Sequence, residues 1–155
     1  MKSKSIDIVN HKSSVPDEDV LESIHAVMHL YRSQQHRALR DGPQAMTHME
    51  SKVLGYFGRQ PGATQSDLAQ HSGRDKAQLA RLIKALRDRG LLAAEADATD
   101  RRNLRLTLTV EGRAAQRAVQ QQAKRLGANA VAGFTAQETA TLLALLQRAK
   151  GNLGP

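Results

Sequence analysis

Residues 64–109 read TQSDLAQHSGRDKAQLARLIKALRDRGLLAAEADATDRRNLRLTLT, and this stretch decides the fold. Thr64 and Asp67 have the spacing of a capping box, which predicts that a short helix begins there. Asp75 is an N-cap residue for a second helix, and Gly90 fits the left-handed position just beyond its end. The first half of the stretch therefore predicts two helices joined by a tight turn.

The second half of the stretch changes from a helical period to an alternating one. Leucine alternates with arginine and threonine over residues 104–108, which predicts a half-buried strand with its leucines on the buried face. Leu91 and Leu92 are expected to begin its antiparallel partner, and residues 95–102 form a charged hairpin loop between them. A helix-turn-helix followed by a β-hairpin is a winged helix-turn-helix, whose second helix enters the major groove of DNA.

Helices are expected on both sides of this unit. Apolar spacing, capping boxes and breaking residues place them at 16–39, 47–60, 109–133 and 135–150. We expect one structural domain that is mainly α with a small β-hairpin wing (α+β). Its parts are a flexible basic tail at 1–14, dimerisation helices at 15–42 and 110–150, and a winged helix-turn-helix DNA-binding region at 44–109.

Composition narrows the classes of function. The chain has 155 residues, a net charge of +8 and no cysteine, which excludes disulfides, thiolate metal sites and cysteine nucleophiles. Aromatic residues make up 3%, too few for a platform that stacks single-stranded bases. No apolar run is long enough for a membrane span or a signal peptide, so we expect a cytoplasmic protein. The basic charge makes a polyanion the obvious partner.

The charge gathers where a DNA interface is expected. Residues 74–105 hold nine basic and five acidic side chains, whereas residues 17–31 hold four acidic and no basic ones. Gln can bond to adenine and Arg to guanine through two hydrogen bonds each, so the start of the second helix has base-reading chemistry. The candidate contacts are Lys76, Gln78, Arg81 and Lys84 on that helix, Arg101 and Arg102 at the wing tip, and Arg74 and Arg105 as phosphate contacts.

Several motifs in a fixed order resemble the MarR family of winged-helix transcriptional regulators. They are MTHMESKVLGYF at 46–57, QSDLA at 65–69, KAQLAR at 76–81, DRR at 100–102 and LTVEG at 108–112. The resemblance spans residues 44–150 and implies a homodimer with intertwined terminal helices. It also implies binding to operator DNA, usually repression, and often release by a small aromatic or anionic effector.

One position departs from the family pattern. Many members have an arginine where this chain has Ala94, and that arginine braces the wing by pairing with the aspartate matched by Asp100. We therefore expect Asp100 to brace the wing through Arg101 or Arg102, or the wing to be looser.

The sequence leaves other functions open. His25, His29 and His36 share a helical stripe near Glu22, which leaves a metal-responsive regulator open, although we expect no metal and no cofactor. Common catalytic motifs are absent from the sequence, so we expect no enzyme. A nucleoid-type DNA-binding protein of low specificity and a protein-interaction module remain alternatives to a sequence-specific regulator.

Overall fold

The structure, a computed structural model, describes residues 17–154, so the tail expected at 1–14 lies outside the described residues. Over that range the helices are α1 (Asp17–Asp41), α2 (His48–Arg59), α3 (Gln65–Ser72), α4 (Lys76–Asp88), α5 (Val110–Ala130) and α6 (Ala136–Leu153). The strands are β1 (Ala63–Thr64), β2 (Leu92–Ala96) and β3 (Leu104–Leu108). The predicted fold class, mainly helical with a small antiparallel sheet, is confirmed.

Side chains cap the helices where the sequence predicts them. Thr47, Thr64 and Thr135 each form a complete capping box with the acidic residue three positions later. The carboxylate of Asp75 accepts hydrogen bonds from backbone amides at the start of α4, and Thr109 caps α5 in the same way. These bonds lie within one helical turn, which is why the starts of the helices are visible in the sequence.

The sheet has the strand order β1-β3-β2, and both pairings are antiparallel. Strands β2 and β3 form the predicted hairpin, but β2 continues to Ala96, so the loop begins at Asp97 and not at residue 95. Leu104, predicted on the buried face, is 39% exposed because it lies at the outer end of β3. Strand β1 was not predicted, because its two residues are too few to show the alternation of apolar and polar side chains that marks a strand.

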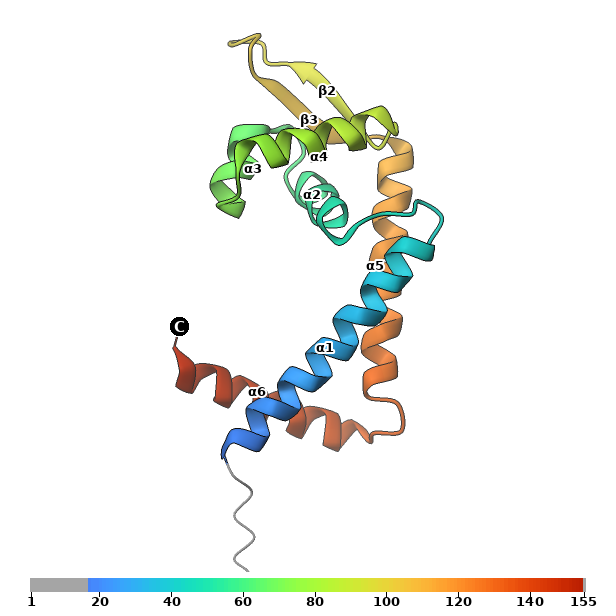
Figure 1. The fold of residues 1–155 in the computed structure, drawn as a ribbon, viewed down its shortest axis with the longest axis vertical. Helices are drawn as coiled ribbons and strands as arrows, with labels where there is room; N and C mark the ends of the chain where they lie inside the picture. Colours follow the sequence, from blue (N-terminus) through green and yellow to red (C-terminus); the bar gives the residue numbers. More distant parts are fainter. Residues whose placement is uncertain (1–16, 155) are drawn as a thin grey trace, which may run out of the picture.

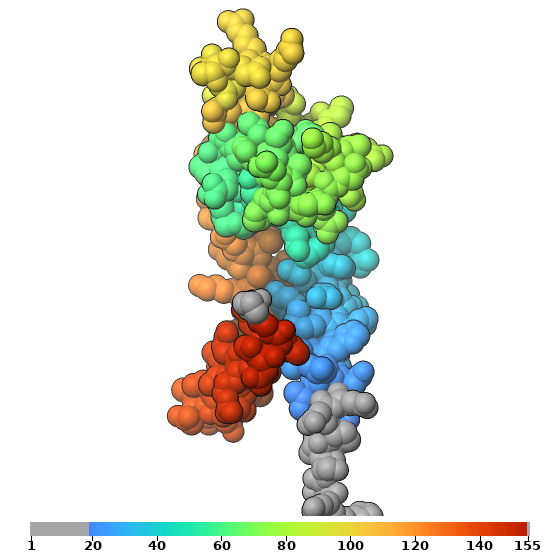
Figure 2. Space-filling view, turned by 90° about the vertical axis from the view of Figure 1, so that its left-hand side faces the viewer, coloured from blue at the N-terminus to red at the C-terminus, as the bar shows by residue number. Residues whose placement is uncertain are grey.

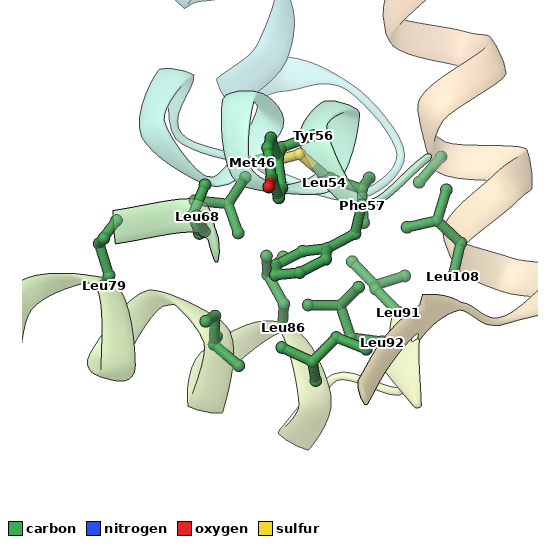
Figure 3. Close-up of a cluster of buried hydrophobic side chains, with 14 of the residues drawn as sticks. Met46, Leu54, Tyr56, Phe57, Leu68, Leu79, Leu86, Leu91, Leu92 and Leu108 are labelled. Atoms are coloured by element: carbon green, nitrogen blue, oxygen red, sulfur yellow. The ribbon is translucent and has the colours of Figure 1, made fainter. Parts of the chain in front are cut away.

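The hydrophobic core lies between α2, α4 and the base of the hairpin (Figure 3). Phe57 and Leu86 point toward each other in its centre, and both are 0% exposed. Burial of a large apolar side chain contributes about 1.5–3 kcal/mol to folding. Leu79 and Ile83 fill the same face of α4, so this core fixes which face of α4 remains outside.

Helices α1, α5 and α6 extend away from this core (Figures 1 and 2). Helix α5 runs from the hairpin toward the far end of the molecule, and α6 lies near the first half of α1. No residue of α6 is buried in the described single chain. The large exposed apolar side chains of α1 and α6 include Val20, Leu21, Val27, Leu30, Leu142, Leu143, Leu145 and Leu146. Within residues 17–154, no helix has the length and apolar character that crossing a membrane requires.

The first turn of α5 packs directly against the turn that ends α4. The Thr109 hydroxyl donates to the Gly90 carbonyl at 2.6 Å, and the Thr109 amide donates to the Leu91 carbonyl at 3.2 Å. Gly112 lies so close to this turn that a Cβ atom there would overlap the Leu91 carbonyl oxygen. The crossing therefore requires glycine at residue 112.

We expect Gly112→Ala to lower the free energy of unfolding by about 1–3 kcal/mol, the cost of overpacking a site whose neighbour is backbone. Urea unfolding checks this. Gly127→Ala is the matched control on the same helix, because nothing lies within 4 Å of a Cβ there. It should leave stability unchanged or raise it by up to about 1 kcal/mol through helix propensity. Equal stability of Gly112→Ala and the unmodified protein would contradict the proposed contact.

Candidate nucleic-acid interface

The outer face of α4 carries the four side chains predicted to meet DNA. Lys76, Gln78, Arg81 and Lys84 are all exposed, whereas the opposite face of the helix is buried in the core. The core and the Asp75 cap together hold this polar face outward. Helix α4 itself lies directly below the hairpin (Figure 1).

The side chains on the exposed face of α4 bond mainly within their own helix, so the face remains available to a partner. The Arg81 Nε atom donates to the Ala77 carbonyl at 3.3 Å, which lays the arginine along its own helix. Lys84 pairs with Asp88 one turn later, and both side chains are well exposed. An exposed pair of this kind contributes little stability, so Lys84 remains available for another partner.

A groove of about 280 Å³ separates α4 from the wing. Lys76, Lys84 and Arg87 line it from α4, and Arg102 and Asn103 line it from the hairpin loop. Arg102 thus faces the same groove as two of the predicted helix residues. Arg101 is also exposed but is not part of the groove lining. The sequence did not indicate Arg87 as a DNA-contact candidate, because a lysine or arginine near the end of a helix is common on any solvent-exposed face.

The ion pair in the wing differs from the expected one. Asp100 accepts a hydrogen bond from the backbone amide of Arg102 at 3.0 Å, and its carboxylate takes part in no ion pair within the described residues. Arg105 instead bonds to Asp97, with 2.8 Å between Nη2 and Oδ2. No ion pair therefore joins Asp100 to Arg101 or Arg102 in the described residues, and a wing-bracing role for Asp100 stays a prediction. Arg105 is engaged within the sheet.

Asp97 is the buried carboxylate of the wing, with 8% of the residue exposed. Hydrogen bonds from the amide and hydroxyl of Thr99, at 2.9 and 2.8 Å, hold the pKa of this carboxyl below its usual value, and Arg105 lowers it further. The carboxylate is thus stabilised in its charged form.

A second long-range contact fixes the end of α4. Arg89 lies with Nη1 3.3 Å from the Glu50 carboxylate, and its Nη2 donates to the carbonyl of Gln44. Glu50 also belongs to the capping box of α2. The end of α4 is therefore attached both to α2 and to the connection between α1 and α2. No local pattern of residues marks this contact, because its partners are far apart along the chain.

Arg74 lies away from the α4 groove. It lines a separate cavity of about 550 Å³ between the helices, together with His48, Lys52, Tyr56 and Gln116. A phosphate contact by Arg74 stays a prediction. The remaining lining comes from α1, α2, α3, α4 and α5.

The three histidines considered as metal ligands do not meet. His25 and His29 are exposed on α1, and the His36 ring lies 5.1 Å from the His48 ring, between centroids. Within residues 17–154, no group of three or more histidine, aspartate or glutamate side chains is arranged to hold a metal.

His48 is a titratable group that sequence reasoning missed. Its Nδ1 atom is buried without a hydrogen-bond partner. Burial lowers the pKa of His48 below 6.5, and Lys52, His36, Arg32 and Arg74 lower it further. The folded protein therefore favours the neutral imidazole.

We expect protonation of His48 to oppose folding. Because its pKa is lower in the folded than in the unfolded state, its contribution to stability is complete above pH 6.5 and declines as pH falls toward the folded pKa. His48→Gln should reduce the loss of thermal stability between about pH 7.5 and pH 5.5. The exposed His25→Gln is the control and should leave that pH profile unchanged. Identical profiles for His48→Gln and the unmodified protein would refute the assignment.

Comparisons with known proteins agree with this architecture. A family model described as "MarR family" matches residues 46–103. The chain is 28% identical over 150 residues to a Thauera aromatica protein described as a candidate transcriptional regulator for the hcr operon, covering 89% of this chain and 90% of that one.

Solved structures share the fold over most of both chains. Streptococcus pneumoniae FabT in complex with DNA aligns with a TM-score of 0.75 and 18% identity, covering 88% of this chain and 96% of FabT. Escherichia coli MarR without ligand aligns with a TM-score of 0.71 and 24% identity, covering 87% and 96%. Residues 46–103 therefore match the family model, and the chain shares its fold with MarR-family winged-helix regulators. Proteins of that family are transcription regulators and not enzymes.

Proposed function

We propose that this protein binds double-stranded operator DNA in a sequence-specific manner and regulates transcription from it. The observation that carries the proposal is the groove in which Arg102 of the wing faces Lys76 and Lys84 of α4. Two elements with donors on adjoining surfaces fit a duplex that lies across them, with the helix in its major groove and the hairpin at a neighbouring minor groove. FabT, which shares this fold, was solved in complex with DNA, and this supports DNA as the ligand.

Base reading is assigned to the first turns of α4. A B-DNA major groove is about 12 Å wide and accepts a helix end-on or lengthwise. Gln78 and Arg81 have the donor patterns for adenine and guanine, whereas Lys76 and Lys84 are point charges suited to phosphates. Arg101 and Arg102 would enter the minor groove, whose negative potential attracts arginine. Arg74 and Arg105 are weaker phosphate candidates.

The competing function is low-specificity DNA binding, as in a nucleoid-type protein. The net charge of +8 favours both functions, the specific regulator and the low-specificity DNA-binding protein, because charge alone supplies the non-specific part of DNA binding. The exposed Gln78, set between basic residues on α4, favours the specific one. An amide adds nothing to charge attraction but can distinguish bases.

A homodimer is part of the proposal. The apolar side chains on α1 and α6 are exposed in the single chain, among them Leu143 at 58% and Leu145 at 53%. Apolar surface of this extent marks an interface in a protein that stays in solution. A two-fold dimer would present two α4 helices to successive major grooves on one face of the duplex.

Repression released by a small effector completes the proposal. The cavity of about 550 Å³ is lined by residues of α1, α2, α3, α4 and α5, and its volume is in the size range of small-molecule sites. Its lining combines the cationic Lys52, Arg59 and Arg74 with the aromatic Tyr56, which fits an aromatic or anionic ligand. Such a regulator would act in the cytoplasm, where the operator is accessible.

Selection of genomic DNA fragments by the purified protein tests the proposed function. The recovered operator should be an imperfect palindrome with half-sites about 10 bp apart, centre to centre. On that operator, Gln78→Ala and Arg81→Ala should each cost about 1–3 kcal/mol and relax the preference at defined base pairs. Fluorescence anisotropy on operator variants measures both effects.

Lys84→Ala is the matched control on the same helix face. It removes a charge without removing a base contact, so it should weaken binding to operator and random DNA alike. A selected pool with no common sequence would reject the specific regulator in favour of the nucleoid-type alternative. Equal losses on all sequences for Gln78→Ala and Arg81→Ala would move those residues to the phosphate class.

The dimer has its own test. Light scattering at micromolar concentration should give about twice the chain mass of 16.9 kDa. Leu145→Lys places a charge in the proposed interface and should shift the protein toward monomer, whereas Ala93→Lys, exposed on β2, should not. A monomer that binds the palindrome with full affinity would refute the dimer.

A further inference from the structure

Arg105 joins the wing to the helix-turn-helix. It lies in β3, the middle strand, with β2 on one side and β1 on the other. One guanidinium nitrogen, Nη2, lies 2.8 Å from Asp97 Oδ2 at the start of the wing loop. The other, Nη1, donates to the Gly62 carbonyl at 3.2 Å, in the turn that leads into β1 and α3. One side chain therefore spans all three strands.

The Asp97 end of this bridge organises the wing loop. Asp97 Oδ1 accepts both hydrogen bonds from Thr99, and Oδ2 receives Arg105, so both carboxylate oxygens are occupied. The Asp97 amide donates to the Asn103 carbonyl at 2.9 Å and closes the loop across its base. Residues 97–103, which include Arg101 and Arg102, thus fold around a carboxylate that Arg105 attaches to the rest of the protein.

We propose that Asp97, Thr99 and Arg105 form a wing clamp, in which Arg105 is a positioning residue that holds Arg102 toward the DNA groove. The inference rests on the proposed DNA-binding function. The guanidinium of this clamp comes from β3, and its carboxylate partner is Asp97.

The position of Arg105 on the sheet favours the positioning role over a direct contact between Arg105 and a DNA phosphate. Leu104 and Leu106 line the groove between α4 and the wing, and successive side chains of a strand point to opposite faces. Arg105 therefore lies on the far face of β3, where it borders an open depression with Gly62 and Asp67. Its influence on DNA would pass through the position of the loop.

Four variants test the clamp by operator affinity at constant salt. Arg105→Ala and Asp97→Ala should each lower the affinity for the operator by about fivefold or more. The double variant should bind with about the affinity of whichever single variant binds less tightly, because both substitutions break the same clamp. Asp97→Ala removes a negative charge, which by electrostatics alone would tighten binding to a polyanion. Glu95→Ala is the matched control, because Glu95 faces Arg105 across the β2–β3 pair, is exposed and makes no ion pair in the described chain. It should bind at least as tightly as the unmodified protein.

An Arg102→Ala background provides the readout that a purely structural role would not change. If Arg105 acts by positioning Arg102, then Arg105→Ala should cause little further loss once Arg102 is removed. If Arg105 contacts phosphate, the second loss should remain and the salt slope should fall by about one contact per subunit. A persistent loss, or Asp97→Ala binding as tightly as Glu95→Ala, would overturn the clamp.

Amide hydrogen exchange tests the clamp without DNA. The amides of Thr99 and Arg102, which bond to Asp97 and Asp100, should exchange faster in Arg105→Ala and unchanged in Glu95→Ala. Where Asp97→Ala does not fold, Asp97→Asn removes the charge at nearly constant shape. Unchanged exchange in Arg105→Ala would refute the clamp. If the unmodified protein bound operator and random DNA equally, while the variants showed the predicted hydrogen exchange, the proposed function would be refuted and the clamp would stand.

Discussion

The structure depends on one close contact, where the first turn of α5 lies against the backbone that leaves α4. Gly112 meets the Leu91 carbonyl there, and the Thr109 hydroxyl bonds to the Gly90 carbonyl. The end of α4, the start of the hairpin and the start of α5 therefore meet at a contact that leaves no room for a side chain at residue 112. Because α5 continues toward the helices proposed to form the dimer, this contact sets the orientation of α4 relative to them.

Acidic and basic side chains have different tasks around α4. Several carboxylates are bound internally: Glu50 and Asp67 in capping boxes, Asp75 at the start of α4, and Asp97 in the wing. Hydrogen bonds from Thr64 hold the pKa of Asp67 below its usual value, so its negative charge serves the helix cap. The basic side chains of α4 and the wing tip are exposed instead. The surface of α4 and the wing tip is therefore positive, although the fold keeps the carboxylates that cap its helices and hold its wing.

Local features of the chain could be predicted from the sequence, and contacts between distant residues could not. Capping boxes at Thr47, Thr64 and Thr135 act within one turn, so residue types at fixed spacing reveal them. The bond between Arg105 and Gly62 joins residues 43 positions apart, and no periodicity marks it. The sequence therefore indicated Arg105 as a basic residue near DNA, while only the fold shows its bond to Asp97.

The same limit applies to the candidate site. The exposed face of α4 followed from its apolar period, and the structure places Lys76, Gln78, Arg81 and Lys84 on that face. Arg87 at the groove and the buried His48 depend on how α2, α4 and the wing pack together, which the sequence alone does not specify. Residue chemistry was thus predictable, whereas the partner of each charge was not.

The central claim is that α4 and the wing together read a particular DNA sequence. Its most direct test is the ratio of affinities of the unmodified protein for its selected operator and for a scrambled fragment of the same length and composition, at physiological salt. The account predicts a ratio on the order of 10³ or more, as sequence-specific regulators show. Equal affinity for the two fragments would contradict it and leave DNA binding to charge alone.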